Sequence, residues 1–394
     1  MPPISVRDIQ IKDDSTCLCA DLIAGTHGRG YWILDDVTPL RQAAEARAAQ
    51  SANAAYLFKP ITAVRVRYAT NDPTPWPPEL PAGENPPPGG IIDYYLSSNA
   101  NGPVKLEILD AAGKLVRSYS SNDRIATPDP AVDPVSYNKL CQATPTAPHC
   151  SLPLYWPAPR MELSTRSGAH RFSWDLHYNP IGAEEAPPED DDAAQGAVPR
   201  HTYPAVNAPW APPGAYTVRL TVDGKTYTQP LTLRLDPRVK TPAAGLAQLN
   251  MLSREMYEGA QATHAAYNQA RALSAELEKA TGADVAALKA KVDSLAPPQS
   301  GGRRGRGFGG GRGRGGAPQG PPTLEAASNA MIAAAMAMQN ADVTPTASQI
   351  EACTRARATS ADVLRRWTAL KAEVNAVNTK RKAAGQPAIS PSGF

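Results

Sequence analysis

The sequence has 394 residues, of which 42% are hydrophobic and 20% charged, and its formal net charge is +3 at pH 7. This balance is typical of a globular protein of several domains, and it excludes a global field that would steer the chain to nucleic acid or an anionic membrane. No stretch approaches the ~20 apolar residues of a membrane-spanning helix, and the N-terminus lacks the basic and apolar regions of a signal peptide.

Residues 1–40 are predicted to form three short strands. Apolar and polar residues alternate over Val6–Ile11 and Asp21–Ala24, and a glycine-rich turn, Gly25–Gly30, precedes the third strand, Tyr31–Leu34. An isolated sheet of three short strands is marginal in water. We therefore expect strands that are absent from this sequence, or a partner chain, to complete the sheet.

The segment 41–90 combines a helix, a strand and a linker. An alanine-rich run, Arg41–Ala55, predicts a helix of about four turns, and Leu57–Tyr68 has the composition of a strand. The proline-dense stretch 69–90 cannot be regular, because proline removes a donor and fixes φ. We place a domain boundary in this stretch.

Residues 91–237 are predicted to form an immunoglobulin-like β-sandwich. Short strands recur with turn residues between them, and Asp223-Gly224 between two alternating runs is a strong hairpin signal. The predicted strands are 91–97, 103–110, 114–120, 170–178, 214–224 and 225–237. Two long proline-rich insertions, 121–166 and 179–213, are expected to decorate one end of the sandwich.

The C-terminal part is predicted to be helical on both sides of a low-complexity segment. Residues 241–296 contain a helix from about Ala243, with Thr241 as its N-cap, and a second helix at about 283–295. The glycine- and arginine-rich segment 297–322 has almost nothing to bury and is expected to be disordered. Helices within 323–386 then pack back on the first pair as an antiparallel bundle.

The most specific string is GTHGRGYWILDD, Gly25–Asp36, followed by TPLRQ. It closely resembles the last blade of bacterial BNR-repeat proteins with sortilin-type (VPS10-like) ten-bladed β-propellers, which are often labelled glycosyl hydrolases. The HRFSWDL string, His170–Leu176, and the helical tail RWTALKAEVNAVNTKRKAAGQPAI resemble later parts of the same proteins. The resemblance covers nearly the whole chain, but the preceding blades are missing from this sequence.

The resemblance implies that the motif closes the propeller. Gly25–Gly30 would form a tight turn, Trp32 would pack between blades, and Asp35-Asp36 would stop the strand. The motif consists of Gly25, Thr26, His27, Gly28, Arg29, Gly30, Trp32, Asp35 and Asp36. The resemblance also implies a secreted or periplasmic protein, with its signal peptide upstream of Met1 and the missing blades of the parent chain as partners.

No catalytic residue is assigned to this chain. A sialidase-like glycosidase needs an arginine cluster, a tyrosine nucleophile and acids from several blades, and the sequence contains no nucleophile-elbow, Walker or H-E-x-x-H motif. We expect a non-catalytic accessory region that braces the propeller and contributes to protein or glycan binding. The alternatives are a glycoside hydrolase whose active site lies on absent blades, a ligand-binding rim at His27 and Arg29, and RNA binding.

No cofactor is expected, and the candidate metal ligands are explained more simply in other ways. Cys141 and Cys150 bracket a proline-rich loop and form a candidate disulfide. His170 and His177 are an odd number of residues apart on the predicted strand and would face opposite sides. Three further groups of residues are candidate binding sites. Cys17 and Cys19 with His27 could bind a metal ion, the acidic run 184–192 could bind calcium, and Arg303–Arg314 could bind RNA. Cys353 is predicted to be a buried thiol.

Overall fold

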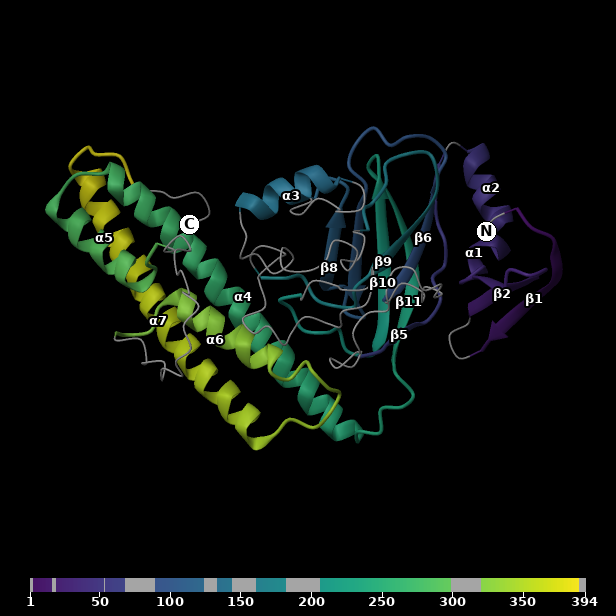
Figure 1. Ribbon diagram of the computed structural model, residues 1–394. Helices are drawn as coiled ribbons and strands as arrows, with labels where there is room; N and C mark the ends of the chain where they lie inside the picture. Colours follow the sequence, from purple (N-terminus) through teal and green to yellow (C-terminus); the bar gives the residue numbers. More distant parts are fainter. Residues whose placement is uncertain are drawn as a thin grey trace. The chain divides into compact units, whose positions relative to one another are not determined.

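The computed structural model describes residues 3–15, 19–52, 54–67, 89–123, 133–143, 161–181, 206–298 and 320–389. The chain forms two compact units, Met1–Lys240 and Thr241–Phe394 (Figure 1). The architecture is mixed α and β: a small N-terminal sheet, a curled five-stranded half-barrel with a smaller sheet against it, and a bundle of long helices.

The first unit begins with an antiparallel sheet in the order β1–β2–β3. Its strands are Val6–Asp14, Cys19–Thr26 and Tyr31–Leu34. Three strands occur where the sequence predicts them, although β1 and β2 extend further. Two short helices follow, α1 (Thr38–Arg41) and α2 (Ala43–Ser51), in place of one predicted helix. The break falls at Gln42, whose side chain hydrogen-bonds the backbone amide and carbonyl of Lys59.

A five-stranded, curled sheet has the order β5–β11–β10–β7–β8, and only the β5–β11 pair is parallel. In that order the strands are Ala63–Arg65, Lys225–Leu235, Gly214–Val222, Lys105–Asp110 and Leu115–Ser120. The hairpin between β10 and β11 is confirmed at Asp223-Gly224, whose φ values of 48° and 78° suit a type I′ turn.

A three-stranded sheet has the order β4–β6–β9, with strands Ala55–Leu57, Gly90–Leu96 and Gly168–Trp174. The predicted strand 57–68 is therefore wrong as one element, because β4 and β5 join different sheets. Helix α3 (Pro134–Ala143) lies in an insertion for which no regular structure was predicted. The Asp133 carboxylate accepts from the Ser136 amide, and Pro134 opens the helix, which is an N-terminal signal that the sequence contains.

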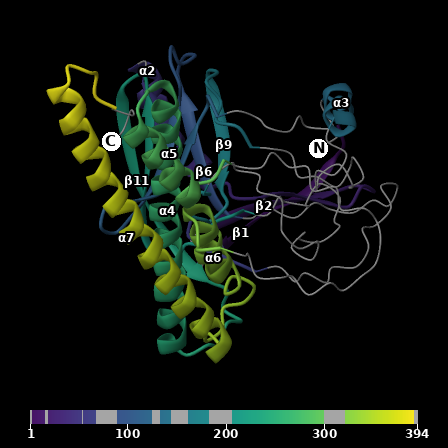
Figure 2. The same ribbon diagram turned by 90° about the vertical axis from the view of Figure 1, so that its left-hand side faces the viewer.

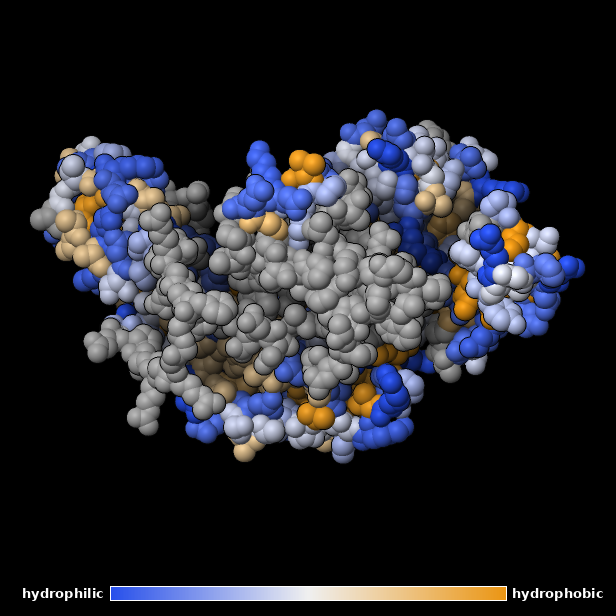
Figure 3. All heavy atoms as spheres, in the orientation of Figure 1, coloured by the Kyte–Doolittle hydropathy of each residue, from blue (hydrophilic) through white to orange (hydrophobic). Residues whose placement is uncertain are grey.

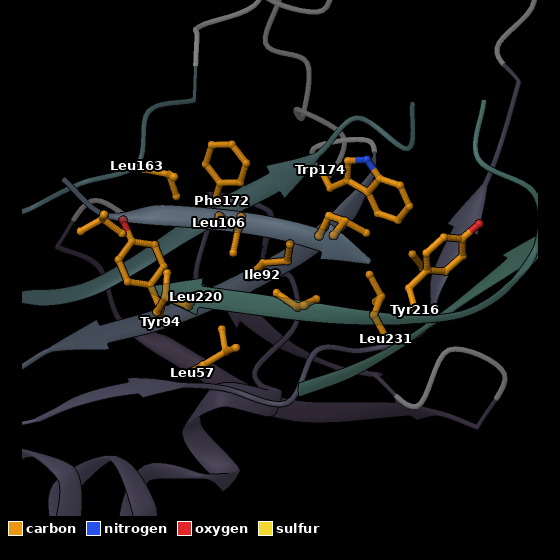
Figure 4. Packing of buried hydrophobic residues seen from close by; sticks show 14 of the residues in the cluster. Leu57, Ile92, Tyr94, Leu106, Leu163, Phe172, Trp174, Tyr216, Leu220 and Leu231 are labelled. Atoms are coloured by element: carbon orange, nitrogen blue, oxygen red, sulfur yellow. The ribbon is translucent and has the colours of Figure 1, made fainter. Parts of the chain in front are cut away.

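The two sheets share one hydrophobic core (Figure 4). β6 alternates buried and half-buried residues along its length, as a strand with one core-facing side should. Tyr94 and Ile92 of β6 and Trp174 of β9 meet Leu106 and Leu220 of the larger sheet. Each of these side chains is fully buried, which contributes roughly 1.5–3 kcal/mol for an aliphatic residue of this size.

The second unit contains four helices in its described part: α4 (Ala243–Lys279), α5 (Ala283–Leu295), α6 (Leu324–Met336) and α7 (Ala347–Ala383). α4 and α7 run side by side (Figure 2), and α6 packs on both. Their core includes Leu273, Val363 and Trp367. None of the described helices combines the length and apolar character needed to cross a membrane.

The starts of α6 and α7 follow local sequence signals. Thr346 caps α7 through a capping box with Gln349, and Thr323 caps α6. The predicted N-cap Thr241 is wrong, because α4 begins one residue later, with Pro242 at the cap. The Thr241 hydroxyl instead donates to the backbone carbonyl of Asp342, a contact between distant residues that the sequence pattern does not reveal.

Candidate functional site

The glycine-rich motif connects β2 to β3. Gly28 and Gly30 have φ values of 77° and 69°, in the left-handed region that glycine adopts without steric cost. The amide and hydroxyl of Thr26 both donate to the Gly30 carbonyl, at 3.1 and 2.7 Å, and close the turn. His27 and Arg29 lie exposed on this turn, and neither lines the cavity described below.

The N-terminal sheet has one apolar face. Paired residues on neighbouring strands project to the same side of a sheet. The strand registers therefore place seven apolar residues together with Asp13 at one end; the seven are here called the apolar face: Ile9, Ile11, Ala20, Leu22, Ala24, Trp32 and Leu34. Ile9, Ile11 and Leu34 each remain more than half exposed, and Figure 3 shows hydrophobic residues at the surface of this part of the molecule. Contiguous exposed apolar surface marks an interaction site.

The two aspartates of the motif follow the end of β3 at Leu34. Asp36 has a φ of 51°, and its amide donates to the Asp21 carboxylate at 3.0 Å. The Asp36 carboxylate accepts from the amide and the hydroxyl of Thr38, where α1 begins. Asp36 therefore stabilises a tight turn between β3 and α1 through its own side chain, and the N-cap position of α1 itself is Val37.

Arg171 of β9 joins this turn to the three-stranded sheet. Its guanidinium donates to the Asp93 carboxylate at 2.9 and 3.3 Å, and to the carbonyl oxygens of Asp35 and Asp36 at 3.0 Å each. Burial raises the pKa of Asp93, and the bonds from Arg171 oppose that rise. Arg171 thus makes two hydrogen bonds to Asp93 of β6 and two to the N-terminal segment, and so links that segment to β6 and β9.

A cavity of about 400 Å³ lies beside this ion pair. One wall is the outer face of β6 and β9, with Asp93, Tyr95 and Arg171. The opposite wall comes from β3, α1, α2 and the segment after β4. It is mostly apolar, with Leu34, Val37, Leu40, Ala43 and Phe58 among its residues, but Arg47 and Gln50 of α2 also line it.

A second polar cluster follows β9, where the predicted strand is wrong beyond Trp174. Leu176 has a φ of 61°, and His177 forms only an isolated bridge to Trp210. The argument that His170 and His177 face opposite sides of one strand therefore does not apply. His170 instead contacts the Arg166 carbonyl at 2.6 Å, and the described residues contain no group of three metal-binding side chains.

Asp175 is the centre of this second cluster. Its carboxylate accepts from Arg117 at 3.0 Å, from the Tyr119 hydroxyl at 3.2 Å and from the His177 amide at 3.0 Å. The His177 ring lies 3.9 Å from the Trp210 ring, centroid to centroid. Burial lowers the pKa of His177 to about 4, an effect that Asp175 opposes. His177 is therefore neutral at pH 7, and its cluster closes one end of the core.

The cysteines are described in part. Cys19 takes part in a disulfide bond, and so does Cys141. Cys17 and Cys150 lie outside the described residues, so the predicted pair Cys141–Cys150 stays a prediction. Cys353 is a free, fully buried thiol, as predicted, and burial raises its pKa. The acidic run 184–192 and the segment Arg303–Arg314 also lie outside the described residues.

No family model, curated protein or solved structure matches this chain. Its candidate site must therefore be judged on its own residues. Sequence reasoning named Asp35 and Asp36 but missed Arg171 and Asp93, which engage them. The available signal was the charge of Asp93 in the otherwise uncharged strand β6 and of Arg171 in β9.

Proposed function

We propose that this chain is a non-catalytic accessory region of an exported β-propeller protein. In this proposal β1–β3 are the remnant of the last blade, and the two sheets that share a core are an immunoglobulin-like sandwich. The sandwich and the helical unit brace the propeller and contribute to binding of a protein or glycan. The observation that carries the proposal is the exposed apolar face of the N-terminal sheet.

The apolar face supports docking onto further β-structure. Ala20 and Ala24 are already buried, but Ile9, Ile11 and Leu34 are large and more than half exposed, and neighbouring sheets bury side chains of this kind against one another. The opposite face carries the polar residues Asp8, Gln10 and Lys12 of β1, but also Ile23 of β2 and the exposed Tyr31 and Ile33 of β3. Only the β1 strand therefore separates polar from apolar residues between the two faces.

The Arg171 contacts support the bracing role. If the N-terminal sheet docks on other blades, it can hold the sandwich in a defined position only when the connection between the sheet and the sandwich is rigid. Four hydrogen bonds from one guanidinium, two of them to main-chain oxygens, provide such a connection. The disulfides at Cys19 and Cys141 support export, because disulfides persist in oxidising compartments.

The proposal is tested on the native polypeptide. An antibody raised against this chain should detect, in the secreted or periplasmic fraction of the source cells, a polypeptide longer than 394 residues. A cytosolic band of 394 residues with reduced cysteines would contradict the proposal. In the longer polypeptide, Trp32→Ser should lower the melting temperature of the propeller, whereas Tyr31→Ser, on the opposite face and 82% exposed, should not.

A further inference from the structure

β1 is an edge strand with a free outer side in the part of the chain that the structure describes. It neighbours β2 alone in the sheet order, and Figure 1 shows it at the margin of the N-terminal sheet. The Ile9 amide donates to the carboxylate of Asp8 at 2.9 Å. Exposed strand edges of this kind pair readily with another strand.

The sequence of β1 is complementary to itself when read antiparallel. A two-fold axis through Gln10 places Ile9 opposite Ile11 and Asp8 opposite Lys12 of the second strand. By symmetry each of these pairs occurs twice. Directly opposed residues of opposite charge, and opposed β-branched residues, both stabilise a sheet. We propose that β1 pairs antiparallel with β1 of a second copy of this chain.

Neighbouring registers are disfavoured by the same residues. An axis through Ile9 would place Arg7 opposite Ile11, and an axis through Ile11 would place Asp8 opposite Asp14. The first opposes a charge to an apolar side chain, and the second opposes two like charges. The axis through Gln10 instead opposes Ile9 to Ile11, Asp8 to Lys12 and Arg7 to Asp13, and leaves the unmatched pair Val6 and Asp14 at the ends of the strand.

The local structure suits this register. The irregularity in β1 lies between Val6 and Asp8, so the stretch from Asp8 to Lys12 pairs regularly with β2. Asp13 pairs with Arg41 at 2.7 Å, and the Asp8 carboxylate accepts from the Ile9 amide and the Gln10 side chain, both within β1. The resulting dimer contains a continuous six-stranded sheet, in which the apolar faces of the two copies lie side by side.

The pairing uses the edge of the sheet and not its apolar face, so it goes beyond the proposed function and does not depend on it. A cytosolic 394-residue product would refute the export proposal and leave the pairing intact. Conversely, a monomeric chain would refute the pairing alone.

Charge reversal tests the proposed pairing. Sedimentation equilibrium of the purified chain should show a monomer–dimer equilibrium. Asp8→Lys or Lys12→Asp alone places two like-charged pairs at the interface and should weaken the dimer about tenfold or more. The double variant Asp8→Lys/Lys12→Asp restores both pairs and should dimerise like the wild type. Circular dichroism checks that the variants, which change exposed residues, remain folded.

Cysteine cross-linking tests the register. Gln10→Cys puts one thiol on each side of the axis at a separation that a disulfide can span, so mild oxidation should give a covalent dimer. Lys12→Cys faces Asp8 of the other strand and should give much less. The pairing is refuted if the wild type is monomeric at every concentration, if the double variant fails to recover, or if both cysteine variants cross-link equally.

Discussion

The guanidinium of Arg171 bonds the carbonyl oxygens of Asp35 and Asp36 at 3.0 Å each, across 135 or more residues of sequence. This contact joins the strand-ending motif of the N-terminal sheet to a strand of the three-stranded sheet. It makes Arg171 the residue on which the position of that sheet depends most directly.

Replacement of Arg171 should loosen the N-terminal segment. Arg171→Ala leaves the half-buried carboxylate of Asp93 without its cation and removes two bonds to main-chain oxygens, and we expect a loss of about 2 kcal/mol in the free energy of unfolding. Hydrogen exchange in 19–52 should accelerate, because the segment loses its attachment. Arg219→Ala is the matched control: it breaks the more exposed pair with Glu107 and should cost under ~1 kcal/mol. Equal effects of both variants on exchange would contradict the attachment role.

Gly89 should not tolerate a side chain. Its φ is 115°, and an added Cβ would lie 2.2 Å from the backbone oxygen of Trp174. Gly89→Ala should therefore cost about 3 kcal/mol or more by denaturant titration. Gly113 also has a positive φ, of 76°, but its surroundings are open, so Gly113→Ala should cost only ~1 kcal/mol. Similar losses would show that the backbone contact at Trp174 is absent.

His177 should make stability depend on pH. Its folded pKa of about 4 lies below the ordinary value of 6.5, so the unfolded chain binds more protons between these values. The contribution of His177 to the free energy of unfolding is fully present above about pH 6.5. It decreases by roughly 3 kcal/mol as the pH falls to 4. Asp175, Arg117 and Arg67 face the ring.

Denaturant titrations of wild type and His177→Gln across this range isolate the contribution. The difference between their unfolding free energies should shrink as the pH falls, while titrating carboxylates affect both proteins alike. A constant difference would show that the ring is not buried as described.

Gly259 and Met331 should be energetically coupled. A Cβ on Gly259 of α4 would lie 1.9 Å from the terminal methyl carbon of Met331 on α6. In a helix, alanine is normally about 1 kcal/mol more favourable than glycine, but the clash with Met331 should cancel this gain in Gly259→Ala. Met331→Ala should lower the free energy of unfolding by about 2–5 kcal/mol, because it leaves a cavity. In the double variant the new methyl occupies vacated space, so its cost should be smaller than the sum. Additive costs would refute the close approach.

The amino-acid sequence alone determined the features that depend on neighbours in the chain. The Asp223-Gly224 hairpin, the helix α5 at Ala283–Leu295 and the strand β3 at Tyr31–Leu34 follow from turn chemistry and hydrophobic period, which act over a few residues. The propeller resemblance and the cellular location stay predictions.

Only the tertiary structure decided which distant groups meet. No local pattern indicates that Arg171 bonds Asp35 and Asp36, that β4 and β5 enter different sheets, or that β9 stops at Trp174 so that Asp175 can gather Arg117, Tyr119 and His177. These arrangements depend on burial and on partners far away in the sequence. The energies of burial and of hydrogen bonding outweigh local secondary-structure propensity wherever a polar group inside the fold needs a hydrogen-bond partner.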